Sequence, residues 1–252
     1  MLTTAVVVIC AGLATEQALA RLEGIWDVRP STERLLPTNA VLFPIASSTA
    51  VQRTIDVDTG DGPVSTPFSG TVLVEGGVVG QLPLALRAGN SVTVTAEPTG
   101  ATFSWSVGQG EDTTPPPPPV PELTLGEDAT TLGFVTGRNI DLRLLVDNDD
   151  AVIAVLERQL NDGPTQPFLA LSLEGGPAEA PQYSDVVAVG STVCYSGDVF
   201  DAAGNSTRFS EVCTDVTAES CAALPAPTIA LALGMLTVRR RPIRKGDRES
   251  QR

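Results

Sequence analysis

The chain has 252 residues, of which 42% are hydrophobic but only 4% aromatic, and it contains 23 glycines and 20 prolines. This composition favours an all-β protein with frequent turns and few helices. The sequence has no histidine, which excludes a Ser-His-Asp triad and removes the commonest general base and metal-binding side chain. We therefore expect a protein that is not an enzyme and has no resident cofactor.

The charge is strongly acidic and unevenly distributed. The whole chain carries −14, although the final stretch from Arg239 to Arg252 holds seven cations and two acids. The remainder therefore carries about −19, which is −14 less the +5 of that stretch. An acidic body of this kind repels phosphate backbones and anionic lipid surfaces, so we expect no nucleic-acid partner.

Residues 1–20 have the pattern of a cleavable signal peptide. An apolar core from Ala5 to Ala14 precedes Ala18-Leu19-Ala20, the small-x-small pattern that signal peptidase recognises. No Lys or Arg precedes the core, whereas export signals normally begin with a positive charge; a wrongly assigned start codon would account for this. The segment predicts export, with cleavage after Ala20.

Residues 37–110 alternate between short apolar runs and turn residues. The runs recur at a spacing of about ten residues with Gly and Pro between them, which is the pattern of a β-sandwich. In the last of them Phe103, Trp105 and Val107 alternate with period two, so we expect all three to face one core. The runs are 40–45, 54–57, 71–74, 82–86, 91–95 and 101–107.

A proline-rich stretch, 111–121, follows this domain. Its five consecutive prolines, 115–119, favour extended polyproline II and cannot join the interior of a sheet, so we expect a stiff spacer. Beyond it, residues 122–218 offer seven further runs, the usual number for a sandwich. These runs are 123–125, 140–146, 152–156, 168–173, 186–189, 192–199 and 208–216.

Three cysteines remain once the signal peptide is removed. Cys194 and Cys213 lie symmetrically about a turn near residues 203–204, and two strands paired through that turn would place them opposite each other. Opposed strand residues have Cα atoms about 4.5 to 5.5 Å apart, within the range of a disulfide. We predict this disulfide, with two buried thiols as the alternative. Cys221 is left unpaired, which favours lipidation, processing or intermolecular bonding.

Two acidic clusters are candidate calcium sites. Their oxygen ligands are dense enough to hold calcium, although neither cluster follows the spacing of an EF-hand. The alternative is that they are solvated carboxylates of turns. The residues concerned are Asp56, Asp58 and Asp61 in the first domain, and Asp147, Asp149 and Asp150 in the second.

An apolar stretch and an arginine cluster close the sequence. Leu224 to Val238 is 15 residues long, or about 22 Å as a helix, shorter than the roughly 30 Å hydrocarbon core of a bilayer. The cluster Arg239, Arg240 and Arg241 would hold the C-terminus in the cytoplasm. The tail, 219–252, therefore predicts contact with the membrane through an apolar helix.

Three segments resemble known families. Residues 37–110, with the run 86–94, resemble Ig-like domains of bacterial surface proteins, and residues 192–212 resemble the closing hairpin of fibronectin type III-like domains. Cys221, the apolar stretch and the arginine cluster resemble the sorting tails of myxobacterial surface proteins. These resemblances imply two tandem sandwiches joined by the proline-rich linker, after an N-terminal segment, 21–36.

The function predicted from these patterns is binding or spacing at a bacterial envelope. The protein would be non-catalytic, located at the cell surface or outer membrane or released after processing of its tail, with an extracellular protein or polysaccharide as its partner. One alternative is a calcium-dependent adhesion protein that uses the acidic loops. Another is an enzyme-associated or inhibitor module.

Overall fold

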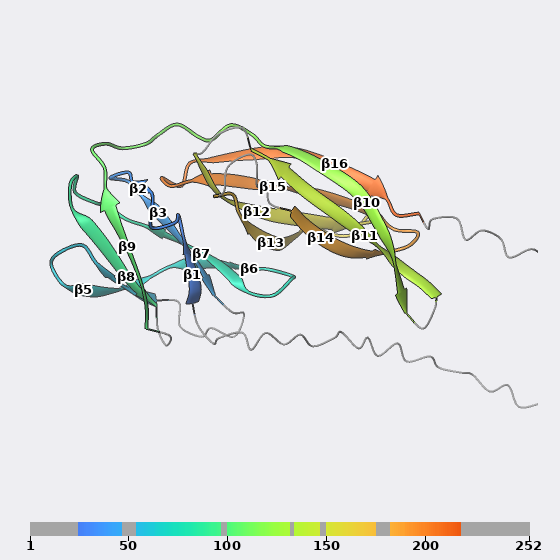
Figure 1. Ribbon diagram of the computed structural model, residues 1–252, viewed down its shortest axis with the longest axis horizontal. Helices are drawn as coiled ribbons and strands as arrows, with labels where there is room; N and C mark the ends of the chain where they lie inside the picture. Colours follow the sequence, from blue (N-terminus) through green and yellow to red (C-terminus); the bar gives the residue numbers. More distant parts are fainter. Residues whose placement is uncertain are drawn as a thin grey trace, which may run out of the picture.

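The described part of the chain is entirely β-structure (Figure 1). The computed structural model describes residues 25–46, 54–96, 100–131, 134–146, 150–174 and 182–217. Their strands form four sheets, so the predicted all-β fold class is confirmed. Within these ranges no helix is long and apolar enough to cross a membrane. The predicted signal peptide and C-terminal helix lie outside the described residues.

The first domain consists of two sheets that enclose one hydrophobic core. Its strands are β1 (Ile25–Arg29), β2 (Leu35–Leu36), β3 (Val41–Ala46), β4 (Thr54–Asp58), β5 (Pro63–Pro67), β6 (Ser69–Val72), β7 (Val78–Pro83), β8 (Ser91–Ala96) and β9 (Ala101–Val107). One sheet has the order β1-β3-β7-β6 and the other β2-β9-β8-β4-β5. As predicted from their alternation, Trp105 and Val107 are buried, and Phe103 packs against the same core as Trp105.

The first domain begins before residue 37, where its start was predicted. β1 pairs with β3 and β2 pairs with β9, so residues 25–36 belong to the domain. The indole N–H of Trp105 fixes the turn between them by donating to the carbonyls of Pro30 and Ser31, both at 3.0 Å. This segment was missed because charged residues and a proline interrupt its two short strands.

The second domain has one strand for each of the seven predicted runs. They are β10 (Val120–Thr131), β11 (Phe134–Leu145), β12 (Ala151–Leu160), β13 (Gln166–Ser172), β14 (Gln182–Ala188), β15 (Thr192–Asp201) and β16 (Ser206–Asp215). The sheet orders are β10-β11-β14 and β13-β12-β15-β16. Phe168 and Tyr195 are fully buried in the core between the sheets, where they pack against aliphatic side chains of both.

The hairpin of β15 and β16 contains the predicted disulfide. Cys194 pairs with Cys213 in the strand register, their Cα atoms are 4.0 Å apart, and their sulfurs are bonded. The turn takes its shape from Gly204, whose φ is 79°, and from Asp201, whose Oδ1 accepts the backbone N–H groups of Ala203 and Asn205. The sequence prediction of this turn and of the disulfide is confirmed.

A third hydrophobic cluster joins the two domains. It combines Phe43 and Ile45 of β3 with Val152 and Ile153 of β12, together with neighbouring side chains of both domains. Backbone hydrogen bonds cross the same boundary, from Val41 to Ala202 at 2.8 Å and from residues 74 and 75 to the carbonyls of residues 167 and 168. The two domains are therefore packed directly against each other.

The linker lies along one side of both domains (Figure 1) and is held by each. The Asp112 carbonyl accepts the side-chain amide of Asn39 in the first domain at 2.7 Å and that of Asn205 in the second at 3.2 Å. Further along, the carbonyl of Pro116 accepts the hydroxyl of Thr207. The linker is therefore bound by both domains, which also contact each other.

Candidate functional site

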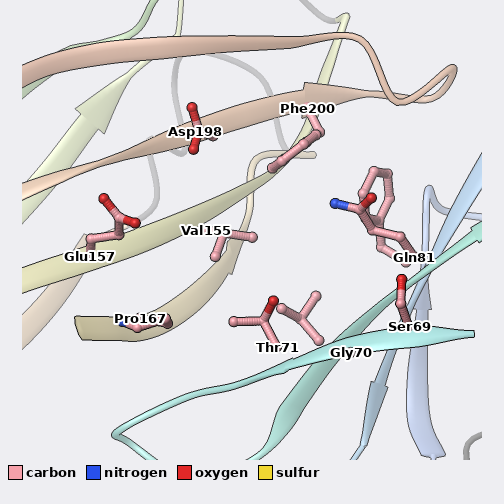
Figure 2. Close-up of a pocket in the computed structure, with 11 residues that line it drawn as sticks. Ser69, Gly70, Thr71, Gln81, Val155, Glu157, Pro167, Asp198 and Phe200 are labelled. Carbon is pink, nitrogen blue, oxygen red and sulfur yellow. The ribbon is translucent and has the colours of Figure 1, made fainter. Parts of the chain in front are cut away.

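A pocket lies at the junction of the two domains. Its volume is about 380 Å³, and it forms where strands β3, β6 and β7 of the first domain face strands β12, β13 and β15 of the second (Figure 2). This volume lies near the lower end of the range found for small-molecule sites. Neither domain could form the pocket alone, because each supplies only one wall.

The inner part of the pocket is apolar. Phe43 and Val79 of the first domain are buried, and Val155 and Phe200 of the second are partly exposed. The rings of Phe43 and Phe200 contact each other across the domain boundary, with centroids 5.5 Å apart. This contact continues the hydrophobic cluster that joins the domains, so the inner wall is part of the interface itself.

The outer part of the pocket is polar and acidic. Ser69, Thr71 and Gln81 line it from the first domain, and the carboxylates of Glu157 and Asp198 line it from the second (Figure 2). Glu157 lies on β12 and Asp198 on the adjacent strand β15. No lysine or arginine is among the lining residues, so the charged groups that line the pocket are both acids.

Arg208 on β16 binds both acids from beside the pocket. Its Nη2 is 2.5 Å from Oε2 of Glu157, and its Nη1 is 3.3 Å from Oδ2 of Asp198. The acid–guanidinium contacts raise the pKa of Arg208, the hydrogen bond to Glu157 being the largest cause. The Arg208 side chain is 54% exposed, so this ion pair contributes little to stability, about 0 to 1 kcal/mol.

A second ionic contact fixes the angle between the domains. The Glu174 carboxylate, in the second domain, is only 8% exposed and bonds Arg29 Nη1 and Arg34 Nε, both at 3.1 Å. It also accepts the backbone N–H of Ser31 at 2.8 and 2.9 Å. All three donors belong to the segment around the turn between β1 and β2. This clasp is therefore a further contact between the two domains, separate from the hydrophobic cluster.

The structure does not bring the first predicted calcium cluster together. Asp56, Asp58 and Asp61 lie on or beside the hairpin of β4 and β5. The Oδ1 of Asp58 accepts the N–H groups of Gly60 and Gly62, and Asp56 accepts the hydroxyl of Ser65. Among the described residues these three acids form no group that could share one ion. Two of the three instead accept hydrogen bonds within the hairpin.

One residue of the second predicted cluster belongs to another group of acids among the described residues. Asp147 and Asp149 lie outside the described residues, but Asp150 meets Asp112 of the linker and Asp201 of the β15–β16 turn, with ligand atoms within 4.8 Å of one another. Burial raises the pKa of Asp201, and hydrogen bonds from Asn205 and Ala203 oppose this. Burial also raises the pKa of Asp150, and the charge of Asp112 raises the pKa of both.

Replacing Asp112 by asparagine is expected to stabilise the protein at neutral pH. Burial is the main reason that the pKa values of Asp150 and Asp201 are raised, and the charge of Asp112 adds to it, so this charge opposes folding where the two carboxyls are ionised. We expect D112N to increase the free energy of unfolding at pH 7 by roughly 0.2 to 1 kcal/mol. The gain should shrink as the pH falls through the raised pKa values of Asp150 and Asp201, because protonation of these carboxyls in the folded state removes the repulsion. Urea unfolding at several pH values measures it.

The same variant tests whether calcium binds where Asp112, Asp150 and Asp201 meet, whereas the calcium site predicted at Asp147, Asp149 and Asp150 stays a prediction. The substitution retains an acceptor for the Thr114 N–H that Oδ1 of Asp112 binds at 3.0 Å, so the local turn is preserved. A calcium-dependent rise in the parent's melting temperature that D112N lacks would support an ion at this position. An identical response of both proteins would count against it.

The remaining predicted site residues divide between the two parts of the chain. Cys194 and Cys213 are disulfide-bonded; Glu211 lies near their sulfurs, but disulfide sulfurs are not the thiolates that bind metals. Cys221 and the arginine cluster of the tail, Arg239, Arg240 and Arg241, lie outside the described residues. Their predicted roles in processing and anchoring stay predictions.

Comparison with known proteins adds no identity. No family model matches this chain, and no curated protein matches it. The resemblances to Ig-like domains, fibronectin type III-like domains and myxobacterial sorting tails therefore stay predictions.

The pocket residues and Glu174 were not predicted from the sequence. Glu157 directly follows the apolar run 152–156, and Asp198 interrupts the run 192–199. An acid on the outer face of a sandwich strand normally faces water, so neither position signals a pocket. A stronger signal was available in the run 152–156 itself, which is apolar at every position and therefore typical of a strand covered on both faces.

Proposed function

We propose that this protein is an exported, non-catalytic binding and spacer protein of a bacterial envelope, with its pocket at the junction of the two domains as the binding site. Support for export comes from the small-x-small motif Ala18-Leu19-Ala20 and from the disulfide, a bond typical of oxidising compartments. Support for a non-catalytic role comes from the lack of histidine. Its partner would be an extracellular protein or polysaccharide.

The observation that carries this proposal is the direct packing of the domains. Two sandwiches on a free linker would sample many relative angles, whereas these share a hydrophobic cluster, a buried carboxylate clasp and a linker held by both. Because its two domains hold a fixed relative position, a unit of this kind has a constant end-to-end length, as a spacer requires, and presents a preformed pocket. Preformed pockets favour binding because less conformational entropy is lost on association.

Fractionation of cells that express the full chain tests the location. We expect the protein in the envelope fraction, accessible to protease added to intact cells, with an N-terminus at Arg21. Mass spectrometry of the mature C-terminus then reports whether the chain is cut near Cys221, and so whether it is retained or released. A cytoplasmic protein that still begins at Met1 would overturn the proposal.

A pair of matched variants controls for the cleavage site. Ala20→Arg removes the small residue that signal peptidase requires directly before the cut, so we expect the precursor mass to persist. Gln17→Arg adds the same charge outside the small-x-small positions and should leave cleavage intact. Equal processing of both variants would show that the cut does not lie after Ala20.

A further inference from the structure

We infer that the interdomain pocket binds the side chain of an arginine presented by a partner protein. This inference rests on the proposed binding function and deepens it by naming the chemistry of the ligand. An arginine has an aliphatic stem and a planar cationic head. The pocket offers a partner for each part: apolar side chains for the aliphatic stem, and two carboxylates beside the polar rim for the cationic head.

Charge selects a cation. Glu157 and Asp198 both line the pocket, no lysine or arginine does, and the body of the protein carries about −19. A pocket whose charged groups all have the same sign, and whose other walls are apolar, concentrates ions of the opposite sign and accelerates their association. Anionic ligands would meet repulsion at the pocket and from the rest of the surface.

The shape favours a long side chain over a compact cation. Val155 precedes Glu157 by two residues on β12, and Phe200 follows Asp198 by two residues on β15, so each acid has an apolar neighbour on its own strand and face. A stem lying along Val155 and Phe200 would bring its head to the two carboxylates. Across the pocket, Gln81 and Ser69 offer oxygen acceptors for the remaining guanidinium N–H groups (Figure 2).

Arg208 shows that these acids accept a guanidinium. Its two terminal nitrogens bond one carboxylate oxygen each, Oε2 of Glu157 and Oδ2 of Asp198, which leaves the other oxygen of each acid for a second cation. Arg208 also neutralises one of the two negative charges. It therefore acts as an internal competitor that weakens the ligand's attraction, and its removal should strengthen binding.

The test uses the purified mature protein and N-acetyl-L-arginine amide as the probe. Two-dimensional NMR of the isotope-labelled protein would follow a titration with the probe, and a parallel titration with N-acetyl-L-citrulline amide, which has nearly the same shape without the charge. We expect the probe to change the amide chemical shifts of residues 69–71, 79–81, 155–157 and 198–200 only. The arginine probe should bind about tenfold more tightly than the citrulline probe. Added salt should weaken the arginine complex.

Variants with opposite expected effects make the test specific. E157Q/D198N should weaken arginine binding by about tenfold or more, and R208Q should strengthen it by about threefold to tenfold. Glu211→Gln removes an acid of the neighbouring strand β16 outside the pocket and should change the affinity by less than about twofold. The side chains replaced in these variants are at least partly exposed, so the variants should fold. Thr71→Trp fills the pocket without changing its charge and should also abolish the chemical-shift changes caused by the probe.

Three results would overturn the inference: equal affinity for arginine and citrulline, shifts outside the pocket, or a loss of affinity in R208Q. Because the titration uses purified protein, its result is independent of where the protein resides in the cell. Arginine binding by a protein that fails the fractionation test would remove only the proposed location. Export without arginine binding would remove only the ligand class.

Discussion

Replacing Asp185 by alanine is expected to destabilise the second domain by about 3 to 5 kcal/mol, the usual cost of removing one partner of a buried ion pair. Asp185 lies on β14, is 5% exposed, and accepts two hydrogen bonds from Arg158 Nη1, at 2.8 and 3.0 Å, and one from the hydroxyl of Tyr195 at 2.6 Å. β14 belongs to one sheet, and the strands of Arg158 and Tyr195 belong to the other. The carboxylate thus links the two sheets through their core.

The loss is large because a buried phenol and a partly buried guanidinium remain. The Arg158 guanidinium, 4.1 Å from the centre of the Phe168 ring, would keep its charge without its counterion. Burial, followed by the hydrogen bond to Asp185, raises the pKa of Tyr195, so the phenol stays protonated near neutral pH and its O–H would be left without an acceptor. An unsatisfied buried donor costs about 1 to 3 kcal/mol by itself.

Urea unfolding followed by near-ultraviolet circular dichroism measures this effect. Asp198→Ala is the matched control, since it removes an acid from an exposed ion pair and should cost about 1 kcal/mol or less. Tyr195→Phe should cost about 1 kcal/mol, because it deletes a single hydrogen bond. If D185A unfolded within about 1 kcal/mol of the parent, the contact between the sheets would have no energetic importance.

Replacing Glu174 by alanine is expected to uncouple the two domains. Its carboxylate is 8% exposed and serves Arg29, Arg34 and the N–H of Ser31 together, so its removal leaves two partly buried cations with fewer partners. We expect a loss of roughly 3 kcal/mol from the interface. The parent should melt in one cooperative transition and E174A in two, because the first domain would then unfold on its own.

Differential scanning calorimetry distinguishes these outcomes. Glu33→Ala is the matched control, because Glu33 is an exposed acid of the same turn and its loss should leave the single transition within about 0.5 kcal/mol of the parent. A single transition of E174A at the parent's melting temperature would show that the remaining contacts couple the domains without this carboxylate.

The strands of the second domain could be predicted from apolar runs between turns, and β15 shows the alternation, with Val193, Tyr195 and Val199 buried on one face. β8 shows the same signal in the first domain, with Val92, Val94 and Ala96 buried on one face. β5 was missed since it begins and ends with proline and is largely exposed, which is the character of an edge strand. Alternation therefore predicts strands with one buried face and fails for short edge strands.

The junction could not be predicted because it depends on which two outer faces meet. β3 and β12 are buried on both faces over most of their length, and their side chains Phe43, Ile45, Val152 and Ile153 form the shared cluster. Continuous burial of this kind shows in the sequence as an unbroken apolar run, but the run does not say what covers the second face. Glu157 and Asp198 become pocket residues only because the other domain stands opposite them.

The disulfide of the last hairpin affects how the protein would respond to a pulling force. If the proposed C-terminal attachment bears load, tension enters β16 and reaches Cys213 after the few residues that precede the tail. From there it passes through the sulfur bridge to Cys194, 19 positions earlier in the chain. The intervening hairpin is therefore shielded from extension, which withholds roughly 60 Å of contour length from a stretched molecule.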